Sequence, residues 1–327
     1  MTGAGRIARI SPEIRLGDRI GGWKARWGIG RMNYIVPPGL YALGEPTAAY
    51  PVLVTANYKM SFDAVRRAMA GRNAWLLVLE TFGINVWCAA GKGTFGTDEL
   101  VRRIEASGLA RVVNHRRLLL PILGAPGIAA HEVAARSGFS VTYAVIRAAD
   151  LPGFLDNGMR TTPAMREMTF TLWERAVLVP VELVLALKSI AVVGALLFLA
   201  FLLGGGMAAG GTAVLVYFGA VLAGGVATPL LLPWLPGRSF ALKGWVAGIV
   251  WSAACYPLAG GGNWSMTTAF AAFLALPAVS AFYALNFTGC STFTSRSGVR
   301  KEMRLALPLM GIVLVVGAIL LLAGRFL

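Results

Sequence analysis

The side chain best suited to chemistry is that of Cys88, which lies in the stretch NVWCAAGK at 85–92. The other two cysteines, Cys255 and Cys290, are widely spaced and form no C-x-x-C pair, so the sequence predicts neither a zinc site nor a disulfide framework. The stretch predicts a short helix with the thiol in its first turn. Unpaired backbone N–H groups there favour a thiolate, and Lys92 adds a cation on the same helical face. A thiolate is a soft ligand, so we predict that Cys88 binds a metal centre that brings its other ligands with it.

Two other kinds of site compete with this interpretation. The residues at 91–96 spell G-x-G-x-x-G, but they do not follow a strand directly and no acid is present at 111–121, as a dinucleotide site requires. A phosphate-binding Walker loop fails as well, because Lys92 is followed by glycine. A cysteine hydrolase needs a histidine base, and His131, on a helix pattern, is a better candidate than His115. An inert, buried thiol is the remaining alternative.

Strand and helix patterns alternate along the first half of the chain. The apolar strand patterns lie at 51–56, 74–80, 117–123 and 139–146, and the helix patterns, the first of them capped by Ser61, lie at 62–68, 97–108 and 128–138. This order predicts an α/β fold, a Rossmann-like open and mainly parallel sheet with right-handed crossovers. Ligands of such sheets bind at the carboxyl ends of the strands. The segment NVWCAAGK follows the second strand and is therefore expected at that edge.

The second half of the chain has the composition of a membrane domain. The whole sequence of 327 residues is 57% hydrophobic and 14% charged, with a mean hydropathy of +0.67. Beyond residue 180 the only acids are Glu182 and Glu302. An all-α transmembrane domain of five helices is predicted, because five apolar stretches approach the roughly 20 residues that a span requires. These stretches lie at 188–205, 212–234, 244–260, 265–287 and 305–324.

Basic residues set the predicted orientation of these spans. Arg238 and Lys243 follow the second span, and the segment 296–304 is basic, so both loops are expected in the cytoplasm and the C-terminus outside. No signal-peptide core precedes the α/β half, which is therefore expected in the cytoplasm. The whole chain is expected to be a multi-pass protein of the inner membrane. The net charge of +15 is interpreted as membrane-surface charge. The predicted organisation is an N-terminal arm packing on the soluble domain at 1–50, a soluble domain at 51–165, an amphipathic linker at 166–187 and a membrane domain at 188–327.

Four stretches of the sequence carry a family resemblance. NVWCAAGKGTFGT at 85–97, PVLVTANYKMSFD at 51–63, LGAPGIAAHEV at 123–133 and NFTGCSTFTSRSGVRKEM at 286–303 resemble the mercury methylation corrinoid proteins. That family is related to the corrinoid-binding subunit of corrinoid iron–sulfur proteins. The resemblance covers nearly the whole chain and is weakest at 1–30. It implies a corrinoid-dependent methyltransferase that transfers a methyl group from cobalt to Hg(II) and forms methylmercury.

The resemblance also implies roles for individual residues. Cys88 would be the lower axial ligand of a base-off, cobalamin-type corrinoid, in agreement with the absence of the D-x-H-x-x-G pattern that supplies a histidine in other corrinoid proteins. Asn85 would fix the helix and Trp87 would shield the cobalt face from water. Ordinary helix packing and loop geometry remain alternatives for the other positions. The predicted cofactor contacts are Thr55, Asn57, Asn85, Val86, Trp87, Cys88, Ala89, Ala90, Gly91, Lys92, Gly93, Thr94, Gly124, Ala125 and Pro126.

The expected partners follow from the same resemblance. They are a ferredoxin-like [4Fe–4S] protein as electron donor, a methyl donor that is either a protein or methyl-tetrahydrofolate, Hg(II) as substrate, and membrane lipids, with no nucleic acid. A protein of another class stays open as the alternative. It would be a membrane transport or sensor protein whose cytoplasmic domain binds a nucleotide or a corrinoid without catalysis.

Overall fold

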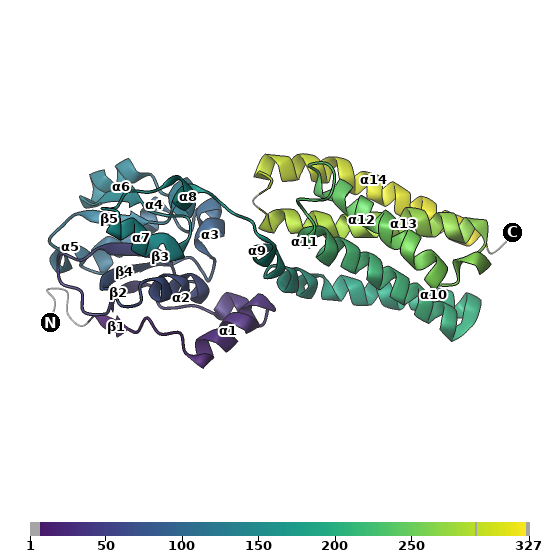
Figure 1. Cartoon of the computed structure of the whole chain (residues 1–327), viewed down its shortest axis with the longest axis horizontal. Helices are drawn as coiled ribbons and strands as arrows, with labels where there is room; N and C mark the ends of the chain where they lie inside the picture. Colours follow the sequence, from purple (N-terminus) through teal and green to yellow (C-terminus); the bar gives the residue numbers. More distant parts are fainter. Residues whose placement is uncertain (1–6, 292, 325–327) are drawn as a thin grey trace. The chain divides into compact units, whose positions relative to one another are not determined.

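The chain forms two compact units, Met1–Thr169 and Phe170–Leu327, in a computed structural model that describes residues 7–291 and 293–324 (Figure 1). The first unit is an α/β domain and the second is helical. The predicted position of Leu327 outside the membrane lies beyond the described residues.

A single six-stranded sheet organises the α/β unit, in the order β1-β2-β4-β3-β5-β6. Its strands are β1 (Ala8–Ile10), β2 (Gly39–Leu43), β3 (Val52–Ala56), β4 (Ala74–Leu79), β5 (Arg117–Leu120) and β6 (Ser140–Tyr143). Strands β4, β3, β5 and β6 pair in parallel, whereas β2 runs antiparallel to β4 and parallel to β1. The predicted α/β sheet is thus confirmed as a mixed sheet. Strands β1 and β2 lie in the segment that was expected to be an arm.

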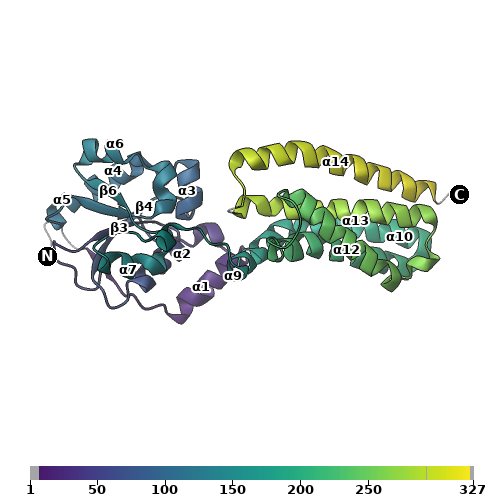
Figure 2. The ribbon, with the colours of Figure 1, turned by 45° about the horizontal axis from the view of Figure 1, so that its top comes forward.

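Helices cover both faces of this sheet. They are α1 (Leu16–Arg26), α2 (Lys59–Ala68), α3 (Val86–Lys92), α4 (Thr97–Ala106), α5 (Leu109–Val112), α6 (Ala130–Ser137), α7 (Leu151–Asp156) and α8 (Pro163–Arg166). Short turns of 3-10 helix are η1 (Arg31–Asn33), η2 (Ile122–Gly127) and η3 (Ala148–Asp150). Figures 1 and 2 show α4 and α6 over one face and α2 and α7 over the other.

The alternation of side chains along β3 explains the two faces. Val52 and Val54 pack into the cluster that includes α4 and α6, while Leu53 packs with residues of α2 and α7. Strand β3 is buried along its whole length, as expected for a parallel strand covered on both faces. The connection after β3 leads to α2 on one face, and the connection after β5 leads to α6 on the other. The carboxyl ends of β3 and β5 therefore border the crevice where ligands of such sheets bind.

Helix α1 is attached to this core through one acidic side chain. Asp18 accepts hydrogen bonds from Lys59 Nζ at 2.6 Å and from Arg66 Nη2 at 2.7 Å, and both cations also bind Asp63. Burial opposes ionisation of Asp18, but the bonds from Lys59 and Arg66 outweigh it and hold the pKa of that carboxyl at about 2. The Tyr34 hydroxyl adds a bond to the Asp18 carbonyl at 3.0 Å. The network fixes α1 to α2.

The second unit is a bundle of long apolar helices. Its elements are α9 (Leu172–Ala176), α10 (Val179–Leu222), the π-helical turn η4 (Ala223–Ala227), α11 (Thr228–Leu230), α12 (Phe240–Leu258), η5 (Gly261–Asn263), α13 (Met266–Asn286), η6 (Phe287–Cys290) and α14 (Arg296–Ala323). Glycines allow close approach of the helices. A Cβ on Gly224 would lie 2.0 Å from the Ser280 carbonyl oxygen, and one on Gly248 would lie 2.5 Å from Pro277 Cα.

Helix α10 reverses direction at Gly206, whose φ of 77° is the left-handed value that glycine tolerates. The reversal brings Gly210 within 2.9 Å, measured from its ideal Cβ position, of the Phe198 carbonyl oxygen. In a straight helix the two residues would lie about 18 Å apart. The predicted spans at 188–205 and 212–234 are therefore the two arms of one helical stretch.

Three helical stretches of the described residues are long and apolar enough to span a membrane: Leu172–Leu230, Met266–Gly289 and Ser297–Ala323. Five separate spanning helices are not confirmed. The first stretch merges two of the predicted spans, and α12, where the predicted third span lies, is not among the three.

Candidate functional site

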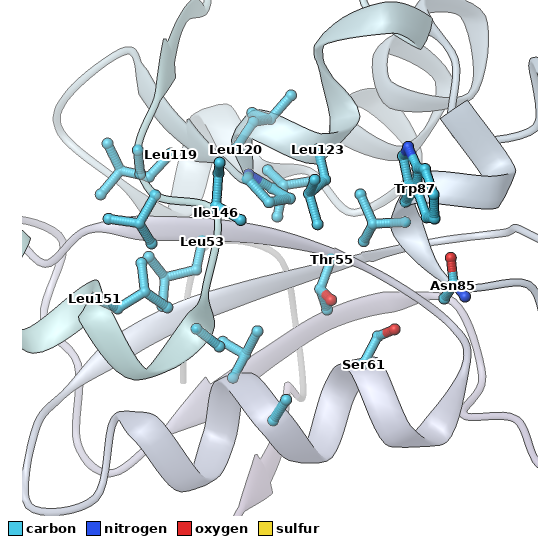
Figure 3. A pocket seen from close by; sticks show the side chains of 18 residues that line it. Leu53, Thr55, Ser61, Asn85, Trp87, Leu119, Leu120, Leu123, Ile146 and Leu151 are labelled. Atoms are coloured by element: carbon cyan, nitrogen blue, oxygen red, sulfur yellow. The ribbon is translucent and has the colours of Figure 1, made fainter. Parts of the chain in front are cut away.

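A cavity of about 330 Å³ opens at the carboxyl ends of β3 and β5. Aliphatic side chains from the strand ends and from the segment after β6 form most of its wall, among them Leu53, Leu120 and Ile146 (Figure 3). Its polar residues are few, as is usual for a pocket that binds a largely apolar group. Thr55, Ser61 and Asn85 supply them.

Helix α3 forms one side of the cavity through Asn85, Val86 and Trp87. Asn85 is the N-cap: its Oδ1 accepts a hydrogen bond from the Cys88 backbone N–H at 2.9 Å. The helix ends at Gly93, whose φ of 84° is left-handed and therefore suits glycine. Thr94 closes that end by donating its N–H to the Ala89 carbonyl at 3.0 Å.

Cys88 lies on the outer side of α3 and is half-buried. Ala89 and Ala90, on the inner side, are buried in the core below α4. The Cys88 side chain does not line the cavity, although both Asn85 and Trp87 do. Cys88 therefore follows directly after the cavity wall in the sequence but is not part of that wall.

The predicted contacts at η2 support α3 from below. Gly124 is buried, and a Cβ there would lie 2.6 Å from the Phe95 ring. A Cβ on Gly127 would lie 2.1 Å from the Phe95 carbonyl oxygen and 3.0 Å from Ala90 Cα. Ala125 and Pro126 do not line the cavity. This segment thus acts through close backbone packing against α3.

Asn57 braces the loop that connects β4 to α3. Its side chain is fully buried, and its Oδ1 accepts hydrogen bonds from the Thr81 N–H at 3.1 Å, the Thr81 hydroxyl at 2.8 Å and the Gly83 N–H at 3.2 Å. Its Nδ2 donates to Glu80 Oε1 at 2.6 Å. Asn57 does not line the cavity. Its amide therefore fixes the polypeptide that carries Asn85 and Cys88 rather than facing the cavity.

A half-buried glutamate, Glu99, holds the start of the same loop. Glu99 accepts hydrogen bonds from the Glu80 backbone N–H and from the side chains of Arg102 and Arg103. Burial raises the pKa of Glu99, but these bonds outweigh it, and the net effect lowers the pKa below its usual range. The loop is thus anchored by hydrogen bonds at Glu80, Thr81 and Gly83.

The other predicted site residues have different positions. Lys92 is exposed at the end of α3. His131 is exposed on α6, and His115 Nε2 lies 2.9 Å from the Tyr50 carbonyl oxygen near the start of β5. Within 7–291 and 293–324, neither histidine forms a hydrogen bond with Cys88, so the arrangement lacks the base pairing of a cysteine hydrolase.

Sequence reasoning missed two parts of the cavity wall. Ser61, expected as a helix cap, lies inside α2, which begins at Lys59, and its side chain lines the cavity. The residues after β6, including Ile146, were expected to belong to a strand that in fact ends at Tyr143. The apolar character of the segment after β6 fits a buried strand as well as a cavity wall, so the sequence held no signal that separates the two.

The site offers a single strong metal ligand. Among the described residues, no group of three or more His, Cys, Asp or Glu side chains is placed to hold a metal ion. A metal bound by Cys88 must therefore bring its remaining ligands, as a macrocyclic cofactor does.

Part of this chain is similar to subunits of CO dehydrogenase/acetyl-CoA synthase and of acetyl-CoA decarbonylase/synthase complexes. Residues 31–144 match the family of the CO dehydrogenase/acetyl-CoA synthase delta subunit, CdhD. The chain is 32% identical over 123 residues to the acetyl-CoA decarbonylase/synthase complex subunit gamma of Methanopyrus kandleri, covering 37% of this chain and 26% of the relative. The subunit gamma of Methanocaldococcus jannaschii is 35% identical over 97 residues, which cover 29% of this chain and 20% of the relative.

These matches correct the identity expected from the sequence. The relatives found are CO dehydrogenase/acetyl-CoA synthase proteins and not mercury methylation proteins, so the predicted membership of the mercury methylation family and the predicted transfer of a methyl group to Hg(II) are wrong. Three of the four stretches quoted for that resemblance, 51–63, 85–97 and 123–133, lie within the matched segment, and the fourth, 286–303, lies outside it. The chain spans about a quarter or less of the length of these relatives. The family match, at residues 31–144, lies within the α/β unit.

Proposed function

We propose that the α/β unit binds a corrinoid at the carboxyl edge of its sheet and carries a methyl group for partner enzymes, with Cys88 as the protein ligand to cobalt. The observation that best supports this proposal is the position of Cys88. Cys88 directly follows residues that line an apolar cavity, on a helix capped by Asn85, within the segment that is similar to a corrinoid-binding family.

The outer side of α3 suits a broad, flat ligand. Cys88 and Gly91 are three residues apart and so share one face of the helix. Apart from its chain neighbours and the backbone of its own helix, a Cβ at Gly91 would meet no atom within 4 Å, so there is open space on that side of Gly91. A cofactor that supplies its own ring nitrogens needs one protein ligand from this face, and Cys88 is the residue that we propose for that ligand.

Each neighbouring residue has a defined part in this arrangement. Asn85 fixes the first turn of α3 through its bond to the Cys88 N–H. Trp87 covers the cavity with an apolar ring and excludes water. The hydroxyl-bearing side chains of Thr55 and Ser61 line the same cavity and offer hydrogen bonds to polar substituents. When bound, a corrinoid supplies a cobalt centre that accepts and releases a methyl group.

The cavity itself suits the base-off form of the cofactor. In that form the nucleotide base is displaced from cobalt and needs a binding site of its own. The wall of the cavity is mostly aliphatic and lies directly beside α3. We therefore assign the displaced base to this cavity.

Partner proteins complete the proposed function. The relatives are named as subunits of a complex, so a methyl donor and a methyl acceptor are expected to bind this chain in turn. A ferredoxin-like [4Fe–4S] protein is the expected reductant, because the three cysteines of the chain are too few for a cluster with four cysteine ligands. The apolar stretches of the second unit would hold the carrier at a membrane, with the α/β unit in the cytoplasm.

The visible spectrum of the purified full chain in detergent tests the proposal. After addition of cobalamin, the native chain should show a shifted spectrum due to thiolate ligation. Cys88→Ala and Cys88→Ser should both lose this shift, because alanine has no donor and the serine hydroxyl is a hard, protonated one. Cys255→Ser makes the same chemical change in α12 and should keep the shift. Asn85→Ala should weaken binding by about 10- to 100-fold, since it removes the group that orients the ligand.

Two results would contradict the proposal. An unchanged cobalamin spectrum in Cys88→Ala would remove Cys88 as the ligand. Absence of any cobalamin binding by the native chain, together with binding of ATP or NAD, would favour the sensor or transport alternative.

A further inference from the structure

The outer face of α1 is apolar and exposed. Leu16, Ile20, Trp23 and Trp27 recur at spacings of three and four residues and so form one stripe along the helix and its C-cap. Trp23 is 73% exposed, Leu16 72% and Trp27 53%, which is unusual for side chains of this size. Beyond Trp27, the next large apolar side chain with similar exposure is that of Ile29, at 62%. Figures 1 and 2 show α1 at the edge of the α/β unit.

The opposite face of α1 packs on the core of the α/β unit. Ala25 is completely buried, and a Cβ on Gly21 would lie 2.5 Å from the Tyr34 hydroxyl oxygen. Asp18, on the same side, is held by Lys59 and Arg66. The helix therefore cannot turn its apolar stripe inward without breaking these contacts.

Cations flank the stripe on both sides. Between residues 15 and 32 the sequence contains Arg15, Arg19, Lys24, Arg26 and Arg31, and the one acid there, Asp18, points toward the core. Arg19 and Lys24 are exposed. A helix with large apolar and tryptophan side chains between basic residues has the pattern of a helix that lies in the surface of an anionic bilayer.

We propose that α1 docks the α/β unit on an anionic lipid surface, inserting Leu16, Ile20, Trp23 and Trp27 at the level of the headgroups. The stretches of the same chain that can span a membrane hold the unit close to lipid, so a short helix of modest affinity is sufficient. Because α1 is fixed to α2 through Asp18, docking would orient the whole α/β unit and not the helix alone. The proposal does not depend on which cofactor the unit binds.

Photocrosslinking of the full chain in lipid nanodiscs tests this docking. Trp23→p-benzoylphenylalanine replaces one exposed aromatic side chain with another, so the fold is expected to persist. In nanodiscs containing phosphatidylglycerol, mass spectrometry should find its adduct on lipid. The same photoreactive residue in place of Glu105, which is exposed on α4, should give little lipid adduct.

Neutralising the cations of α1 tests whether the apolar stripe binds anionic lipid or another partner. The double variant Arg19→Gln with Lys24→Gln should lower the ratio of docked to free α/β unit roughly 30-fold, since each surface cation contributes about a factor of five. With the native charges in place, the lipid adduct at position 23 should be lowered in the same way when the nanodiscs contain phosphatidylcholine alone. Arg111→Gln with Arg160→Gln removes two exposed cations outside α1 and should change little.

Three outcomes would overturn the docking proposal. An adduct between position 23 and the chain's own second unit would show that the stripe is covered by protein. An adduct with a second copy of the chain would show a dimer contact. No adduct in either lipid would show that the stripe stays in water.

Discussion

Asn57→Ala should loosen the site without touching the cavity wall. The substitution removes the oxygen that accepts three hydrogen bonds, two from Thr81 and one from the Gly83 N–H. At about 1 kcal/mol net for each bond, the loop loses about 3 kcal/mol of local stability. The donation from Asn57 to Glu80 is lost as well. The loop leads directly into the turn that carries Cys88, so its opening should displace the thiol.

Hydrogen exchange of the full chain in detergent measures this effect. The amides of Thr81 and Gly83 should exchange about 100-fold faster in Asn57→Ala, which corresponds to the expected loss of about 3 kcal/mol. Cobalamin binding should weaken in parallel. For the exchange rates, Thr55→Val is the matched control, because it removes a polar group from the same strand end but none of these bonds. Weakened cobalamin binding with unchanged exchange at Thr81 and Gly83 would refute the reasoning and make Asn57 a direct contact of the ligand.

Three further outcomes are expected. The pKa of Asp18 is about 2 in the folded protein and 3.8 ordinarily, so its ionised form should contribute about 2 kcal/mol to the free energy of unfolding. This contribution should be present above pH 4 and disappear as the pH falls through 2. Acid titrations of unfolding should show that this pH dependence is lost in Asp18→Asn. Gly127→Ala should destabilise the α/β unit by about 3 kcal/mol in urea titrations, because its Cβ would meet the Phe95 carbonyl oxygen, and an unchanged midpoint would contradict the packing described. Gly224→Ala should separate the helices that meet at Ser280 and lower the thermal midpoint of the second unit in detergent.

Much of the sheet could be predicted from the sequence because its central strands are covered on both faces. VLVTA and AWLLVL read as continuous apolar runs, and β3 and β4 lie within a residue or two of the predicted bounds. Strand β2 could not be predicted in this way. Its sequence GLYAL begins with glycine and shows no clear alternation, and its place beside β4 depends on a pairing with a strand that begins 31 residues later than Leu43.

The helix that carries Cys88 could be predicted from local signals, since Asn85 begins it and Gly93 ends it. The surroundings of the thiol could not. The role of Asn57 depends on a loop 24 residues further along the chain, and no local pattern reports such a contact. The reversal of α10 at Gly206 is similar, because the glycine-rich segment there also fits an ordinary loop between two spans.

The position of β2 has a consequence for any shortened form of the protein. A fragment that begins at residue 51, the start of the predicted soluble domain, lacks both β1 and β2. It would leave the backbone of β4, from Ala74 to Val78, without the partner that pairs with it in the full chain. An exposed strand of this apolar sequence is a template for pairing with other chains. Such a fragment is therefore expected to aggregate, and expression of the isolated α/β unit should start before Ala8.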